Sequence, residues 1–178
     1  MEAIQVLDTA IKIGLGACIS GVTAYVVTIK NNNHQKKSSL IEKKITILQN
    51  ASESIDTYLI KLNDVFSWMD GILRQGYEPG LIPNSDLDRL NIREKDRALI
   101  DSRKLRSRAI SQLNLIGAHE AAKHCETLQE LENKYRMQVI FKPMIPTEDE
   151  LKEFREEFKT IKNSIYVELQ SYFEKLYS

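Results

Sequence analysis

Hydrophobic residues concentrate first in residues 10–29, a stretch of twenty residues near the start of the chain with Lys12 as its one charged side chain. A helix of that length, rising ~1.5 Å per residue, reaches about 30 Å, the thickness of a bilayer's hydrocarbon core. The pattern predicts a transmembrane helix within residues 1–30, a polar juncture at residues 31–38 and a helical domain at residues 39–178. Asp8 precedes the apolar stretch and no small-residue cleavage site follows it, which is not typical of a cleavable signal peptide.

On a helical wheel the predicted span has three faces. One is broadly apolar and suits lipid. A second carries only small residues and predicts close packing between neighbouring helices: Ala10, Gly14, Ala17, Gly21 and Ala24. The third is polar, is costly against lipid, and is expected to line a pore: Lys12, Gly16, Ser20 and Thr23. Two alternatives stay open. Lys12 could extend to the membrane surface, and small or hydroxyl residues are common in any span, so the stripes could arise by chance.

The charges that flank the span predict its orientation. Glu2 and Asp8 lie before it, and five lysines follow it closely: Lys30, Lys36, Lys37, Lys43 and Lys44. Because positive flanks stay in the cytoplasm, we expect the N-terminus outside a bacterial inner membrane and the C-terminal domain in the cytoplasm. The two cysteines, Cys18 and Cys125, cannot form a disulfide framework, which agrees with a reducing compartment.

Beyond the span the hydrophobic pattern is helical and predicts an all-α domain, an antiparallel bundle of about four helices. The first helix is expected to run from about Ser39 to Gln75, which is longer than an ordinary globular helix. A second is expected from Asn84 or Ser85 to Ile116, and a third from Ala118 to about Ile140. No stretch alternates with a period of two residues, so no strand is expected.

The last helix has the clearest signals. Thr147 and Glu150 form a capping-box pattern that predicts its start. Its apolar positions recur every three or four residues and are expected to be core: Leu151, Phe154, Phe158, Ile161, Ile165, Leu169, Tyr172 and Leu176.

Motifs for catalysis or metal binding do not emerge from the sequence. His119 and His124 are five residues apart, whereas a zincin needs histidines four apart on one helix face. Helical ribonucleases of the HEPN type carry an arginine four to six intervening residues before a histidine, and no histidine here has one. We therefore expect no enzymatic activity, no catalytic residue, no metal and no cofactor.

Charge is balanced overall, with 25 basic and 25 acidic residues, which argues against a general nucleic-acid binder. Residues 89–108 are locally basic, and Arg97, Lys104 and Arg108 share one helix face. One hypothesis is a docking surface for an acidic protein, RNA or anionic lipid headgroups. The other is a solvated face with local ion pairs, or with bridges between subunits.

The layout of one N-terminal span followed by a small all-helical domain, in 178 residues, resembles the membrane-anchored accessory proteins of type VI-B CRISPR systems. The resemblance rests on layout and implies a divergent HEPN-like bundle and a ring-shaped membrane pore that supports antiviral defence.

Two functional hypotheses follow. The first is a homo-oligomeric inner-membrane pore or membrane-perturbing effector. The second is a non-conducting membrane-tethered adaptor. The expected partners are the lipid bilayer, further copies of the chain, and a soluble CRISPR effector or another cytosolic protein.

Overall fold

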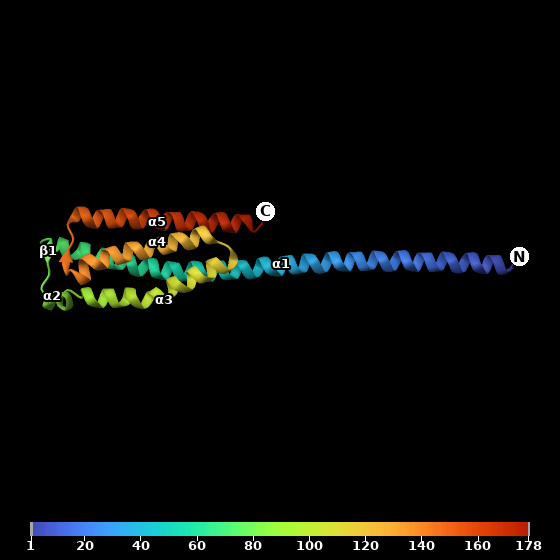
Figure 1. Cartoon of the computed structure of the whole chain (residues 1–178), viewed down its shortest axis with the longest axis horizontal. Coiled ribbons are helices and arrows are strands. Elements are labelled where there is room, and N and C mark those ends of the chain that lie inside the picture. Colours follow the sequence, from blue (N-terminus) through green and yellow to red (C-terminus); the bar gives the residue numbers. More distant parts are fainter. Residues whose placement is uncertain (1, 178) are drawn as a thin grey trace. The chain divides into compact units, whose positions relative to one another are not determined.

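The protein is all-α, as predicted. A computed structural model describes the backbone of residues 2–177 and the side chains of residues 35–177. Two strands of two residues each, β1 before α2 and β2 before α5, pair with each other at one end of the bundle (Figure 1). In chain order the elements are α1 (Glu2–Arg74), β1 (Gly80–Leu81), α2 (Asn84–Arg89), α3 (Ile92–Ile116), α4 (His119–Arg136), a π-helix (Met137–Phe141), β2 (Met144–Ile145) and α5 (Glu148–Lys175).

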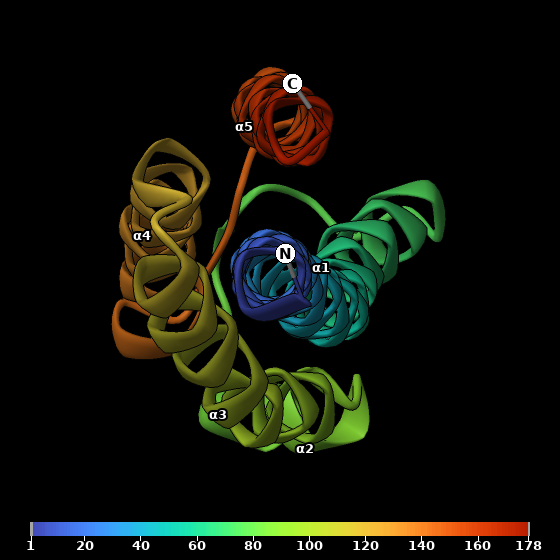
Figure 2. The same ribbon diagram turned by 90° about the vertical axis from the view of Figure 1, so that its right-hand side faces the viewer.

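The chain divides into two units, Met1–Lys43 and Lys44–Ser178. The first is the N-terminal part of α1. The second contains the rest of α1 and all later elements, and it is the helical bundle. Within this second unit α4 lies between α3 and α5, and the later part of α1 packs alongside them (Figure 2).

The core of the bundle is built from apolar residues that recur on one face of each helix. In α1 the buried positions include Leu48, Ile55, Tyr58, Leu62, Phe66 and Met69. In α5, Leu151, Phe154, Phe158, Ile161, Ile165 and Leu169 are buried, which confirms the predicted stripe as far as Leu169. Tyr172 is only partly buried against the core, and Leu176 lies just past the end of α5.

Four aromatic rings from α1, α4 and α5 meet in the core. Phe66 lies 5.0 Å from Tyr135 and 5.7 Å from Phe158, measured between ring centroids, and both pairs are edge-to-face. Phe154 lies 5.3 Å from Tyr135 in the same geometry. Edge-to-face pairs of this kind add to the stabilisation that burial alone gives, because the positive edge of one ring meets the negative face of another.

The prediction of one helix from Asn84 or Ser85 to Ile116 is wrong in one respect, because two helices, α2 and α3, occupy this segment. The break lies between α2 and α3, where Asn91 has a φ of 53°. Asparagine tolerates this left-handed conformation better than most residues, and an α-helix cannot continue through it. The indole nitrogen of Trp68 in α1 donates a 2.7 Å hydrogen bond to the Leu90 carbonyl, and the Lys95 ammonium lies 4.7 Å from the centre of the Trp68 ring. The junction between α2 and α3 is therefore held by contacts with Trp68 of a third helix, α1.

The short strands were not predicted. Gly80 pairs with Ile145 and Leu81 with Met144 in antiparallel register. The Ile82 amide extends the connection by donating to the Pro143 carbonyl at 2.7 Å. Two residues per strand are too few to give an alternating pattern, so the sequence carries no signal for them.

Among residues 35–177, no helix combines the length and the apolar character needed to cross a membrane. The predicted span at residues 10–29 lies outside the residues whose side chains are described.

The capping box at the start of α5 is present as predicted. The Glu150 amide donates to Thr147 Oγ1 at 3.2 Å, and the Thr147 amide donates to the Glu150 carboxylate at 2.8 Å. The hydrogen bond from the Thr147 amide lowers the pKa of Glu150, because it favours the ionised carboxylate.

Thr147→Ala should lower the free energy of unfolding by about 1 kcal/mol, because an amide in the first turn of α5 loses its acceptor. Thr160→Ala is the matched control in the same helix, since the Thr160 hydroxyl only bonds the Glu156 carbonyl of the preceding turn. Its effect should stay within about 0.5 kcal/mol. Thermal unfolding followed by circular dichroism measures both. Equal effects for the two variants would contradict the importance of the cap.

Candidate functional site

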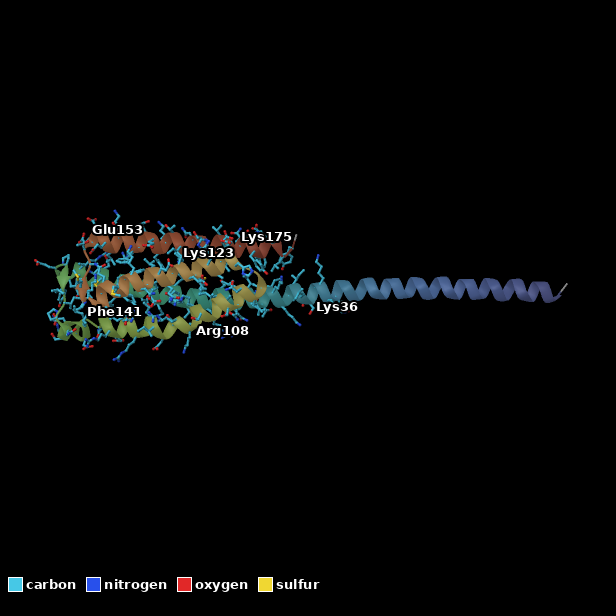
Figure 3. The ribbon with its side chains drawn as sticks, in the orientation of Figure 1. Lys36, Arg108, Lys123, Phe141, Glu153 and Lys175 are labelled. Carbon is cyan, nitrogen blue, oxygen red and sulfur yellow. The ribbon has the colours of Figure 1, made fainter. Side chains whose placement is uncertain are left out.

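The basic residues predicted as a docking surface lie at the surface of α3. Arg97, Lys104 and Arg108 are all exposed, and none of them makes an ion pair with another described residue. Figure 3 shows Arg108 on α3 and Glu153 on α5, on opposite sides of the bundle. Other basic residues of this region are already paired: Arg93 lies 2.6 Å from Asp88, and Arg103 lies 2.6 Å from Glu132. Arg97, Lys104 and Arg108 therefore differ from Arg93 and Arg103, because their charges have no acidic partner among the described residues.

Beneath this face lies a buried network centred on Glu132 of α4, whose side chain is 0% exposed. Its carboxylate accepts hydrogen bonds from the Tyr58 hydroxyl, Arg103 Nε and Arg106 Nη1, each at 2.7 Å. Arg106, 5% exposed, also donates to the Tyr58 hydroxyl at 2.9 Å and to the Gln129 amide oxygen at 3.2 Å. Three helices, α1, α3 and α4, therefore meet at one carboxylate.

A second buried pair lies further along the same helices. Arg136 of α4 donates two hydrogen bonds to Asp96 of α3, at 2.6 and 3.1 Å. These bonds raise the pKa of the Arg136 guanidinium, since the carboxylate stabilises its charge. The guanidinium also lies 5.2 Å from the centre of the Phe141 ring in the π-helix. A bidentate pair of this kind holds both side chains in one geometry and also adds to the interaction energy.

Burial raises the pKa of two further polar groups in the core, Tyr58 and Cys125. Desolvation raises the pKa of the Tyr58 phenol, and the Glu132 carboxylate raises it further. Desolvation also raises the pKa of the Cys125 thiol to about 12. At neutral pH both groups are protonated, so the thiol of Cys125 is a poor nucleophile and Tyr58 acts as a hydrogen-bond donor.

The two histidines considered for metal binding lie at the start of α4. His119 Nδ1 is 3.0 Å from the Asn114 amide oxygen, and His124 is half-buried. In the part of the chain with described side chains, no group of three or more His, Cys, Asp or Glu residues is arranged to hold a metal ion.

Sequence reasoning missed the buried network, although a signal for it exists. Arg106 occupies a position in the apolar register of α3, between Leu99 and Leu113. Glu132 occupies one in α4, between Leu128 and Tyr135. A charged residue at a core position of one helix, matched by an opposite charge at a core position of the next, predicts a buried pair.

The predicted membrane residues cannot be placed in the same way. The small-residue face at positions 10, 14, 17, 21 and 24 and the polar face at positions 12, 16, 20 and 23 lie outside the described side chains. Their roles stay predictions from the sequence.

Glu132→Gln should lower the free energy of unfolding by about 3–5 kcal/mol, because the buried Arg106 guanidinium loses the charge that offsets its burial. The control is Glu157→Gln, which removes an exposed pair whose atoms lie 3.5 Å apart, from Glu157 to Lys134. That change should stay within about 1 kcal/mol. Thermal unfolding of the full chain measures both. A Glu132 variant as stable as the control would show that the network contributes little.

Comparison with protein family models, with characterised proteins and with solved structures finds no match. The likeness to the CRISPR-associated accessory proteins therefore rests on layout, and the function has to be argued from the residues themselves.

Proposed function

We propose that this chain is a homo-oligomeric protein of the bacterial inner membrane that forms a pore or otherwise perturbs the bilayer. The observation that carries the proposal is the stretch at residues 10–29, which matches the bilayer in length and contains one charged residue, Lys12. The layout it shares with the type VI-B accessory proteins suggests a role in CRISPR-linked antiviral defence.

The division of this stretch into faces supports assembly. A single anchoring helix gains nothing from a separate row of small residues, whereas helices that pack against each other need one so that their backbones can approach. The polar row at Lys12, Gly16, Ser20 and Thr23 would then face away from lipid, toward a lumen that the assembled helices enclose.

The charge flanking the span supports one orientation. Lys30, Lys36 and Lys37 follow it, so the bundle would lie on the cytoplasmic side and would receive the signal that opens the pore. Nothing in this proposal calls for a cofactor, a metal or a catalytic residue.

A second candidate function is a non-conducting adaptor that recruits a soluble partner to the membrane. The observation that favours it is the exposed basic face of α3, where Arg97, Lys104 and Arg108 make no ion pair with another described residue. Such a face can bind an acidic protein by charge complementarity.

Replacing Gly14 and Gly21 together with leucine should break the assembly and lower its mass, because the added side chains hold the helix backbones apart. The measurement is the mass of the solubilised protein by light scattering after size exclusion. Leucine at Val22 and Val26, on the broad apolar face, is the matched control and should leave the mass unchanged. An oligomer that survives the glycine replacements would make the span an anchor only.

Lys12→Glu should shift the ion selectivity of the pore toward cations in planar-bilayer recordings, because a ring of lysines near one mouth repels cations and a ring of glutamates attracts them. The variant must keep the oligomeric mass of the wild type. A wild-type oligomer that neither conducts nor depolarises cells would favour the adaptor instead.

A further inference from the structure

Two exposed stripes, one on α3 and one on α5, run along the bundle. On α3, residues spaced three or four apart are all exposed: Arg97, Asp101, Lys104, Arg108, Ser111 and Leu115. On α5 the equivalent set is Asp149, Glu153, Glu156, Thr160, Asn163 and Val167. Residues at this spacing lie on one side of a helix, so each set forms a continuous surface row. These are called the α3 stripe and the α5 stripe below.

The two stripes are complementary in charge. The α3 stripe carries three cations and one anion, Asp101, whereas the α5 stripe carries three anions and no cation. The exposed Lys152 and Lys159 lie beside the α5 stripe and offset part of its negative charge. None of the seven charged residues within the stripes makes an ion pair with another described residue. Both rows are therefore available to a partner.

The stripes also match in order. Each begins with its charges, continues through hydroxyl or amide side chains and reaches one exposed aliphatic residue, Leu115 (76% exposed) on α3 and Val167 (63% exposed) on α5. In both, the aliphatic residue lies eighteen positions after the first charged one. That distance is about five helical turns, so the two rows repeat over the same length.

Their placement prevents them from meeting within one copy. α4 lies between α3 and α5, and the two helices occupy opposite sides of the bundle (Figure 2). Both begin near the end that holds β1 and β2, so they run in the same direction (Figure 1). A second copy in the same orientation could lay its α5 stripe along the α3 stripe, with Arg97 near Asp149, Lys104 near Glu156 and Leu115 near Val167. In this register Asp101 and Glu153 fall at the same position as like charges, so the attraction comes from the other two pairs and from the net charge of the rows.

We propose that the α3 stripe of one copy docks on the α5 stripe of the next copy. The interface is head-to-tail, because it joins two different surfaces, and repetition of such an interface closes into a ring when the rotation between copies allows it. The inference rests on the proposed function, since membrane-anchored copies share one orientation and only parallel stacking aligns the two rows.

A cysteine pair tests the contact directly. Leu115→Cys and Val167→Cys are placed in one full-length chain that also carries Cys18→Ala, and Cys125 stays because it is buried. Mild oxidation should link copy to copy and give a ladder of covalent oligomers. Each single-cysteine chain should give no ladder, because an α3 stripe does not meet another α3 stripe.

Charge exchange gives an independent test. Lys104→Glu should weaken self-association about tenfold or more, and so should Glu156→Lys, because like charges then face each other at the position that the two rows share. Asp149 is left unchanged, since it supports the start of α5. A mixture of the two variants should assemble again, because the Lys104→Glu surface of one copy then meets the Glu156→Lys surface of the next. Lys123→Glu with Glu126→Lys, on the exposed side of α4, is the control and should leave assembly unchanged.

The outcomes separate this interface from the proposed function. An oligomer of unchanged mass that gives no ladder and tolerates both charge reversals overturns the interface and leaves the membrane assembly standing. A wild-type chain that is a monomer by light scattering overturns both. Cross-linking through Leu115→Cys alone also overturns the head-to-tail arrangement, because it requires two α3 stripes to face each other.

Discussion

The arrangement of the bundle depends on one buried carboxylate, that of Glu132, which needs hydrogen bonds and positive charge around it. Glu132 has no contact with solvent, and an ionised group in that position is tolerated only when charges and hydrogen bonds surround it. Arg103, Arg106 and Tyr58 meet that demand from two other helices. Hydrophobic packing is not directional, so it constrains the rotation of α3 less sharply than hydrogen bonds between named atoms do. Three directed hydrogen bonds of about the same length leave far fewer arrangements.

This constraint also decides what the outer surface of α3 presents. Arg106 points into the bundle, so the residues on the other side of the helix, among them Lys104 and Arg108, must point outward. The buried pair of Asp96 and Arg136 fixes the same helix nearer its start. The inner charges therefore set the rotation of α3, and that rotation leaves a row of cations exposed on its outer face.

Sequence reasoning recovered the features that depend on local periodicity. The stripe of α5 from Leu151 to Leu169 and the capping box at Thr147 follow from spacing within one helix, and both are present. The all-α class follows in the same way. The break at Asn91 was missed because residues 84–116 contain no proline or glycine to mark it. The contact that the structure shows there comes from Trp68, which is distant in sequence.

The charged residues illustrate the same limit. The sequence groups Arg97, Arg103, Arg106 and Arg108 as one basic segment, yet their surroundings differ entirely. Arg103 and Arg106 bind Glu132, which comes from another helix, whereas Arg97 and Arg108 face solvent. Which arginines form ion pairs depends on contacts between different helices of the bundle. Periodicity within α3 predicts only which arginines lie on its inner side.

Trp68 is the only tryptophan in the chain, alongside seven tyrosines. Its indole nitrogen binds the carbonyl at the junction of α2 and α3, and a lysine lies over its ring. The long-wavelength fluorescence of the protein therefore originates from one point at this junction. A change in emission would report a local opening there, even while the helical content measured by circular dichroism stays constant.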